Sequence, residues 1–241
     1  MEVVVAGSGV PARVGGRPPL IAVSDIVSAG RELGMRNLSI NAVAARLGVS
    51  ATALYRHISG RWELERLVGE SLLAELELVD DPARSAEDHL RAFGVSLHRY
   101  ALDNPGLATY MQVLFPRGEA GARLLADEIA ALGRRGYTAE GAALLSSSVA
   151  VLAIGLAAQH ELKAEASGGD DGFVVERDAA AERLAGDAAL GPVHSAGMQL
   201  SSPQYLELLL NALIRGLLTS VVPGRPINDI MADLTAGGED R

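Results

Sequence analysis

The chain has 241 residues, of which 49% are hydrophobic and 4% aromatic, and it contains no cysteine. This length allows a sizeable buried core, and the lack of cysteine excludes disulfide bonds and thiolate metal sites. The net charge of −9 is unevenly spread. Residues 1–69 carry eight arginines and five acidic residues, and the remaining residues carry 13 basic and 25 acidic ones. A positive N-terminal segment on an acidic body favours a protein that presents one end to phosphate.

The composition predicts an all-α fold, because alanine and leucine dominate and no sustained polar–apolar alternation occurs outside Val3–Val5. The N-terminus lacks the basic segment of a secretory signal. The longest apolar stretch, Ala142–Ala158, contains three serines and is shorter than the roughly 20 residues of a membrane span. We therefore expect a cytoplasmic protein that does not enter a membrane.

The chain begins with a predicted flexible arm, residues 1–19, which is rich in glycine, proline and arginine. A first helix is expected over Leu20–Leu33, with Val23 and Ile26 among its inward residues. A second helix follows at Ser39, which is a suitable N-cap. Four apolar residues of this helix share one face: Ile40, Val43, Ala44 and Leu47. Gly48 then ends the helix, because a residue without a Cβ readily adopts the left-handed conformation.

A third helix is predicted over Ala51–Ile58, with Ser50 as its N-cap and with Leu54 and Ile58 facing inward. Four of its residues project outward: Thr52, Tyr55, Arg56 and His57. Two short helices joined by a glycine turn, the second with a polar outer face, form the helix-turn-helix plan. In that plan the second helix enters the DNA major groove.

Helical spacing of apolar residues continues through the rest of the chain. It predicts a fourth helix over Arg61–Val79, in which Trp62 packs against the first helix. Later helices are expected over Glu87–Asp103, Leu107–Leu114, Gly118–Arg134, Thr138–Ala166 and Pro203–Val222. We expect a long loop over residues 167–200, with a possible short helix near Asp178–Leu184, and a frayed tail over residues 223–241.

The helix-turn-helix segment resembles the signature of the TetR family of bacterial transcriptional regulators. The matching residues are Gly48-Val49-Ser50, Leu54-Tyr55, His57-Ile58, Arg61 and Leu64. The C-terminal part resembles the tetracycline-repressor branch of this family. It does so at Gly136-Tyr137, Ile154-Gly155-Leu156 and Leu213-Ile214-Arg215-Gly216-Leu217.

The resemblance implies a three-helix DNA-binding domain over residues 20–66 and a helical effector-binding and dimerisation domain over residues 67–222. The two longest C-terminal helices, Thr138–Ala166 and Pro203–Val222, would pair with those of a second copy as a four-helix bundle. Such a homodimer would repress transcription from a palindromic double-stranded DNA operator, and a small hydrophobic effector would release it.

Eight residues are candidates for DNA contact: Ser39, Ser50, Ala51, Thr52, Tyr55, Arg56, His57 and Arg61. Thr52 and Ala51 can meet a base edge or a thymine methyl group. Arg56 can reach guanine or phosphate. By the resemblance, Tyr55 and His57 bind the DNA backbone, and Arg61 replaces a lysine that grips phosphate near a helix N-terminus.

Six polar or aromatic residues on otherwise apolar helices are candidates for effector contact: His98, Tyr110, Gln112, Phe115, Gln159 and His160. Relatives that bind magnesium–tetracycline use a histidine in the short helix and an acid on the long helix. This chain has Tyr110 and Gln159 at those positions. We therefore expect no metal and no cofactor.

Three other classes of function remain open at this point. An enzyme is disfavoured because the sequence has no His-Glu-x-x-His motif, nucleophile elbow or cysteine nucleophile. An effector-independent architectural DNA-binding protein would leave about 170 residues beyond the DNA module without an evident role. A helical small-molecule-binding protein is the remaining alternative.

Overall fold

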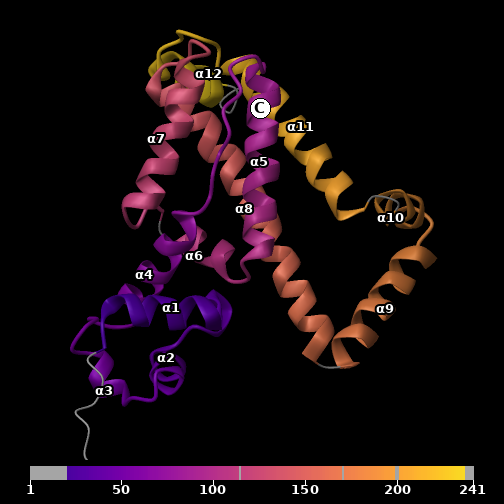
Figure 1. Cartoon of the computed structure of the whole chain (residues 1–241). Coiled ribbons are helices and arrows are strands. Elements are labelled where there is room, and N and C mark those ends of the chain that lie inside the picture. The colour runs from indigo at the N-terminus through magenta and orange to yellow at the C-terminus, as the bar shows by residue number, and fades with distance from the viewer. Residues whose placement is uncertain (1–20, 114, 170, 199–200, 237–241) are drawn as a thin grey trace, which may run out of the picture.

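The computed structural model describes residues 21–113, 115–169, 171–198 and 201–236. All regular secondary structure within these ranges is helical. The predicted all-α class is therefore confirmed. A small N-terminal module of three helices lies at one end of a taller helical body (Figure 1). The predicted arm, residues 1–19, lies outside the described residues.

The N-terminal module contains α1 (Val23–Leu33), the 3-10 turn η1 (Met35–Asn37), α2 (Ile40–Arg46) and α3 (Ala51–Leu54). Its helices enclose a core of its own, composed of Ile26, Ala29, Leu38, Val43, Ala44, Leu54, Ile58, Leu64 and Val68. Val23 was expected to face inward, but it is exposed because it starts the helix beyond the edge of this core.

The two predicted caps are present in the module. Ser39 Oγ accepts a hydrogen bond from the backbone N–H of Ala42 at 3.1 Å, and Ser50 Oγ accepts one from that of Ala53 at 3.3 Å. Gly48 has a φ of +69°, which is the left-handed conformation predicted for it. The helix after Ser50 is shorter than predicted, because hydrogen bonds that span three residues tighten the backbone after Leu54.

Helix α4 (Arg61–Leu73) belongs to both parts of the molecule. Leu64 and Val68 complete the core of the N-terminal module, and Leu72 and Leu73 enter the core of the body. The helix ends six residues before the predicted end at Val79. Leu76 is nevertheless buried, because the non-helical segment that follows α4 packs against the body.

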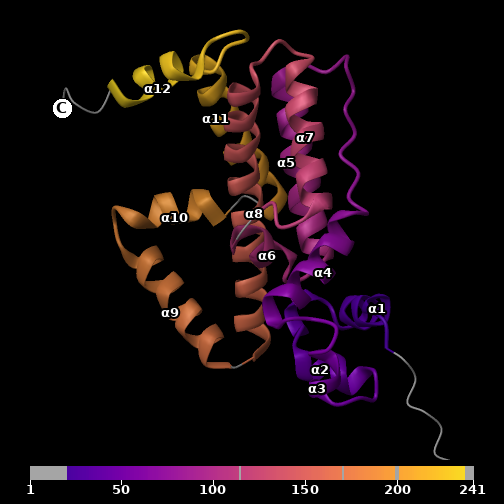
Figure 2. The same ribbon diagram turned by 90° about the vertical axis from the view of Figure 1, so that its left-hand side faces the viewer.

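The body contains α5 (Ala86–Asp103), α6 (Leu107–Val113), α7 (Glu119–Gly133), α8 (Ala139–Gly169), α11 (Ser202–Ser220) and α12 (Ile227–Ala236). The first five of these lie within three residues of the predicted helices. Helices α5, α7, α8 and α11 run beside one another along the length of the body (Figure 2). They enclose a second core around Leu90, Leu145, Leu210 and Ile214.

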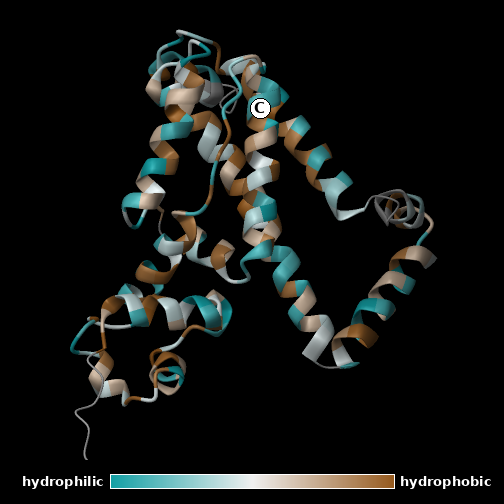
Figure 3. Ribbon diagram, viewed as in Figure 1, coloured by the Kyte–Doolittle hydropathy of each residue, from teal (hydrophilic) through white to brown (hydrophobic). Residues whose placement is uncertain are grey.

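Two segments differ from the sequence-based expectation. Residues 171–198 form α9 (Asp171–Gly186) and α10 (Leu190–Met198) rather than a long loop with a short helix near Asp178–Leu184, and the two helices stand to one side of the body in Figures 1 and 2. Hydrophobic and hydrophilic residues are mixed along α9, so the helix has no continuous apolar face (Figure 3). The predicted frayed tail is wrong for residues 227–236, because α12 buries Ile230 in the second core.

Helix α8 is the one described helix that is long and apolar enough to cross a membrane. In its most apolar window, 44% of the residues are buried inside the molecule. The helix packs against α5, α6, α7 and α11. A central core helix meets the same criteria of length and composition, so they are weak grounds for a membrane span.

Candidate functional site

The outer face of the second helix of the helix-turn-helix is polar and accessible. Thr52 and Arg56 are exposed, and Tyr55 has 56% of its surface accessible. Ala51 and His57 are half-buried. Burial of Leu54 and Ile58 on the opposite side fixes this orientation, so hydrogen-bonding groups and a cation stand on the surface.

The start of α4 lies next to this surface. Glu63 Oε2 accepts hydrogen bonds from the backbone N–H and the hydroxyl of Ser59, both at 2.7 Å. These bonds, the backbone one foremost, hold the pKa of Glu63 below its usual value. The side chain of Arg61 is 75% exposed, and its Nε lies 2.6 Å from Glu65 Oε1. Its charge is therefore accessible at the helix N-terminus.

Trp62 was predicted to pack against the first helix, but its side chain lies elsewhere. It is 63% exposed, and the guanidinium carbon of Arg117 lies 5.4 Å from its ring centroid. Arg117 also lies 4.7 Å from the ring centroid of Tyr110, between the two aromatic side chains. This cluster joins the start of α4 to the body.

A second contact between the module and the body involves Arg36 in η1. Its backbone N–H donates to the carbonyl of Pro105 at 3.1 Å, and its Nε lies 2.8 Å from Glu165 of α8. The turn before α6 lies very close to the backbone of η1, since a Cβ on Gly106 would lie 2.5 Å from the backbone nitrogen of Arg36. The module is thus docked on the body through α4 and η1.

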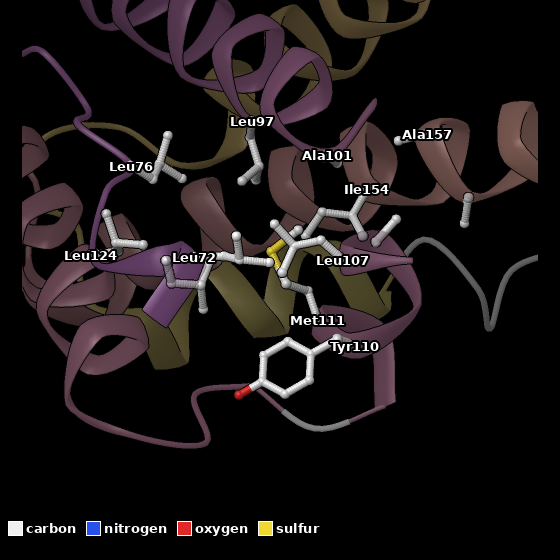
Figure 4. Packing of buried hydrophobic residues seen from close by; sticks show 13 residues of the cluster. Leu72, Leu76, Leu97, Ala101, Leu107, Tyr110, Met111, Leu124, Ile154 and Ala157 are labelled. Atoms are coloured by element: carbon white, nitrogen blue, oxygen red, sulfur yellow. The ribbon is translucent and has the colours of Figure 1, made fainter. Parts of the chain in front are cut away.

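The body contains a cavity of about 550 Å³. Helices α4, α5, α6, α7 and α8 and the segment after α4 contribute to its walls. Its lining is mainly apolar and includes Leu73, Leu76, Phe93, Leu97, Met111, Leu124 and Ile154. Figure 4 shows Leu97, Leu124, Met111 and Ile154 from four helices, and Leu76 from the segment after α4, converging on one region. A cavity of this size and lining suits a small organic molecule.

The six predicted effector residues are divided among three hollows. Gln112 and Phe115 line the 550 Å³ cavity. His98, Gln159 and His160 line a smaller hollow between α5, α8 and the start of α11. Tyr110 lines a third, at the junction of the module and the body. The structure therefore does not bring the six together.

Two of these residues have perturbed ionisation. Burial, followed by the nearby charge of Glu70, raises the pKa of Tyr110, whose hydroxyl donates to Glu70 Oε1 at 3.3 Å. Burial and the charge of His160 lower the pKa of His98. The neutral form of each side chain is therefore favoured.

Sequence reasoning missed a buried charged group beside the cavity. His89 of α5 and Glu128 of α7 are 4% and 3% exposed, and His89 Nε2 lies 3.0 Å from Glu128 Oε1. His89 Nδ1 faces Asp80 Oδ1 at 3.4 Å, and Asp80 pairs with Arg135 at 2.8 Å. These residues are far apart in the sequence, so no local motif indicates the cluster. An ionisable residue within an apolar helical stripe was the only available signal.

Comparisons with known proteins place this arrangement in context. No family model matches the chain. An HTH-type transcriptional regulator of Saccharopolyspora erythraea is 33% identical over 152 residues, which cover 56% of this chain and 64% of that protein. The match thus spans less than two thirds of the relative's length.

Solved structures match over most of the chain. ActR of Streptomyces coelicolor, described as a TetR family protein in complex with actinorhodin, is 25% identical with a TM-score of 0.70. The alignment covers 86% of this chain and 100% of ActR. A TetR variant of Acinetobacter baumannii in complex with minocycline is 20% identical with a TM-score of 0.59, over 84% and 99% of the two chains, which is a likeness of fold. With its helix-turn-helix and its helical body, the chain is similar to regulators of the TetR family.

Proposed function

We propose that this chain is a cytoplasmic DNA-binding transcriptional regulator that acts as a repressor. Two copies bind a palindromic operator, and a small, largely apolar molecule in the 550 Å³ cavity releases them. The observation that carries this proposal is the position of α4. The same helix completes the core of the helix-turn-helix module through Leu64 and forms part of the cavity wall through Leu73.

The outward face of the second helix supports the role in DNA binding. Thr52 and Arg56 reach base edges in the major groove, and Tyr55, His57 and Arg61 bind the phosphate backbone. Ser39 and Ser50 stand at helix N-termini, where backbone N–H groups favour phosphate. Ala51 offers a methyl group beside the groove.

Exposed apolar residues on α11 support a homodimer. Tyr205 and Leu208 lie three residues apart on one face of the helix, and 45% and 53% of their surfaces are accessible in the single chain. On the long helix α8, Leu162 is 65% exposed. Pairing α8 and α11 with those of a second copy buries such residues and sets the distance between two recognition helices.

Release requires the ligand to favour a conformation in which the two modules no longer match the half-site spacing of about 34 Å. Coupling of about 1.4 kcal/mol already lowers DNA affinity tenfold, so a small tilt of α4 is sufficient. Magnesium is not required, because Tyr110 and Gln159 lie in separate hollows and neither supplies a carboxylate or an imidazole.

A thermal-shift screen with hydrophobic natural products and antibiotics, followed by DNA competition with each hit, tests the proposal. Hits that stabilise the protein are expected to lower its affinity for DNA, with or without a divalent metal. Hits that stabilise the protein and leave DNA affinity unchanged would contradict the coupling. A hit that depends on a divalent metal would contradict the proposed ligand chemistry.

A further inference from the structure

The cavity has a single charged group in its wall. Among the described residues that line it, Glu128 of α7 is the one with a formal charge. The residue is 3% exposed, and its neighbours in the wall include Leu124 and Leu125 of the same helix. A carboxylate in such apolar surroundings is strongly destabilised unless donors satisfy it.

The hydrogen-bonding capacity of Glu128 is largely unused. Its Oε1 and Oε2 lie 3.0 and 3.1 Å from the same atom, His89 Nε2, and His89 is the one donor to Glu128 among the described residues. A carboxylate has about four acceptor sites. One shared N–H therefore leaves acceptor positions on a buried group that borders a cavity.

Charged side chains of both signs surround this pair. Asp80 Oδ1 faces the other ring nitrogen of His89, and Asp80 also accepts hydrogen bonds from Arg134 and Arg135. Two carboxylates and two guanidinium groups thus surround one imidazole. A cationic group on a ligand would have to be desolvated in this apolar cavity, whereas a hydroxyl adds a donor and no charge.

We infer that Glu128 is the specificity-determining residue of the cavity and that it selects apolar molecules carrying a neutral hydroxyl donor. The hydroxyl donates to the free acceptor position of the Glu128 carboxylate, and the apolar part of the ligand fills the space between α5, α6 and α8. This inference rests on the proposed function, because it assigns the chemistry of the same cavity.

A matched pair of probes tests the inference on the full-length protein. 2-Naphthol and 2-methoxynaphthalene share one aromatic skeleton, but only the first has a hydroxyl donor. Because hydrogen bonds to charged groups are the stronger ones, the wild type is expected to bind 2-naphthol about tenfold more tightly. Equal affinity of the wild type for the two probes would overturn the inference without any substitution.

Two variants assign the preference to its residue. Glu128→Gln removes the charge and is expected to bring the two affinities close to each other while leaving the affinity for 2-methoxynaphthalene unchanged. Ser147→Ala removes a hydroxyl from the same cavity wall, one that donates to the Leu144 carbonyl of its own helix, and is expected to keep the preference. A preference for 2-naphthol that survives in folded Glu128→Gln protein would overturn the inference.

A third variant separates this inference from the proposed function. Ala150 lines the cavity, so Ala150→Trp fills it and is expected to abolish binding of both probes. If both probes still bind to this variant, or neither binds to the wild type, the cavity is not the ligand site and both proposals fail. If Ala150→Trp blocks binding but the wild type does not prefer the hydroxyl, only the role of Glu128 fails.

Discussion

The Glu70 carboxylate of α4 accepts a hydrogen bond from the backbone N–H of Ala120, in the first turn of α7, at 2.8 Å. The same oxygen accepts a second bond, from the N–H of Gly121 at 3.1 Å. Gly118, at the N-cap position of α7, has no side chain with which to satisfy these groups. A side chain of the helix that joins module and body therefore caps a helix of the cavity wall.

Glu70→Ala leaves these N–H groups without their acceptor and removes a negative charge from a helix N-terminus. We expect it to lower the free energy of unfolding by about 1–2 kcal/mol, measured by urea titration. Glu77→Ala, at an exposed position after α4, is the control and is expected to change stability little. Equal stability of the two variants would contradict the capping role.

Gly69 of α4 lies against the Tyr110 ring of α6. A Cβ on this residue would lie 2.6 Å from Tyr110 Cζ. We therefore expect Gly69→Ala to destabilise the protein by about 1–3 kcal/mol, because the ring is buried and cannot move freely. Gly133→Ala has open space for its methyl group and is expected to stabilise the protein by about 0.5–1 kcal/mol. Thermal unfolding of both variants measures the difference, and a stabilising Gly69→Ala would contradict the packing argument.

Arg61 and Thr52 are expected to contribute to DNA binding in different ways. Arg61→Ala should weaken binding about equally across sequences and reduce the slope of log affinity against log salt by about one. Thr52→Ala should change the preferred sequence, at a cost of about 1–3 kcal/mol for the original one. Fluorescence anisotropy at several salt concentrations measures both effects. An unchanged salt slope in Arg61→Ala would contradict the phosphate contact.

Asp80 makes stability sensitive to acid. Burial alone would raise its pKa, but hydrogen bonds and charges from Arg135 and Arg134 outweigh it and hold the pKa below the usual 3.8. Its contribution is therefore present above about pH 4 and is lost as the pH falls through the lower pKa of the folded state. Asp80→Asn should be less stable than the wild type at pH 6, and the difference should shrink toward pH 2.

Urea unfolding at several pH values checks this expectation. Asp103→Asn, at the exposed end of α5, is the control and should follow the wild-type pH profile. A constant difference in stability between Asp80→Asn and the wild type from pH 6 to pH 2 would be inconsistent with the role of Asp80.

Leu208 tests the proposed dimer surface. Leu208→Glu places a charge in the apolar face of α11 and is expected to shift the protein from dimer to monomer in light scattering at micromolar concentration. Val79→Glu makes a similar change at a residue that is 74% exposed on the segment after α4, and it should leave the dimer intact. A monomeric wild type, or dimers in both variants, would contradict the assignment of this surface.

The helix-turn-helix was predictable because its signals are local. Ser39, Gly48 and Ser50 act on backbone groups within a few residues, so the sequence is sufficient to locate the turns. The end of α4 was not predictable in this way. Leu76 continues the apolar spacing of the helix, but it belongs to the non-helical segment after α4 and is buried there. Asp80, in the same segment, forms ion pairs with Arg134 and Arg135, which are distant in the sequence.

The sequence predicted an effector site in the helical body, but not the arrangement of side chains around the cavity found there. Gln112 lines a different hollow from His98 and Gln159, because the three residues lie on different helices whose packing the sequence does not give. His89 and Glu128 are 39 residues apart and meet only because α5 and α7 pack together. Apart from the short helix expected near Asp178–Leu184, α9 and α10 were not predicted, because glycines and acidic residues flank them and few of their apolar residues are buried.

Selection of binding sites from random double-stranded DNA by the full-length protein tests the central claim most directly. The account predicts enrichment of an inverted repeat whose half-sites lie about one helical turn, or 34 Å, apart. It also predicts that Arg56→Ala and Thr52→Ala alter the enriched half-site. A selection that yields no enriched sequence, or one without two-fold symmetry, would contradict the account.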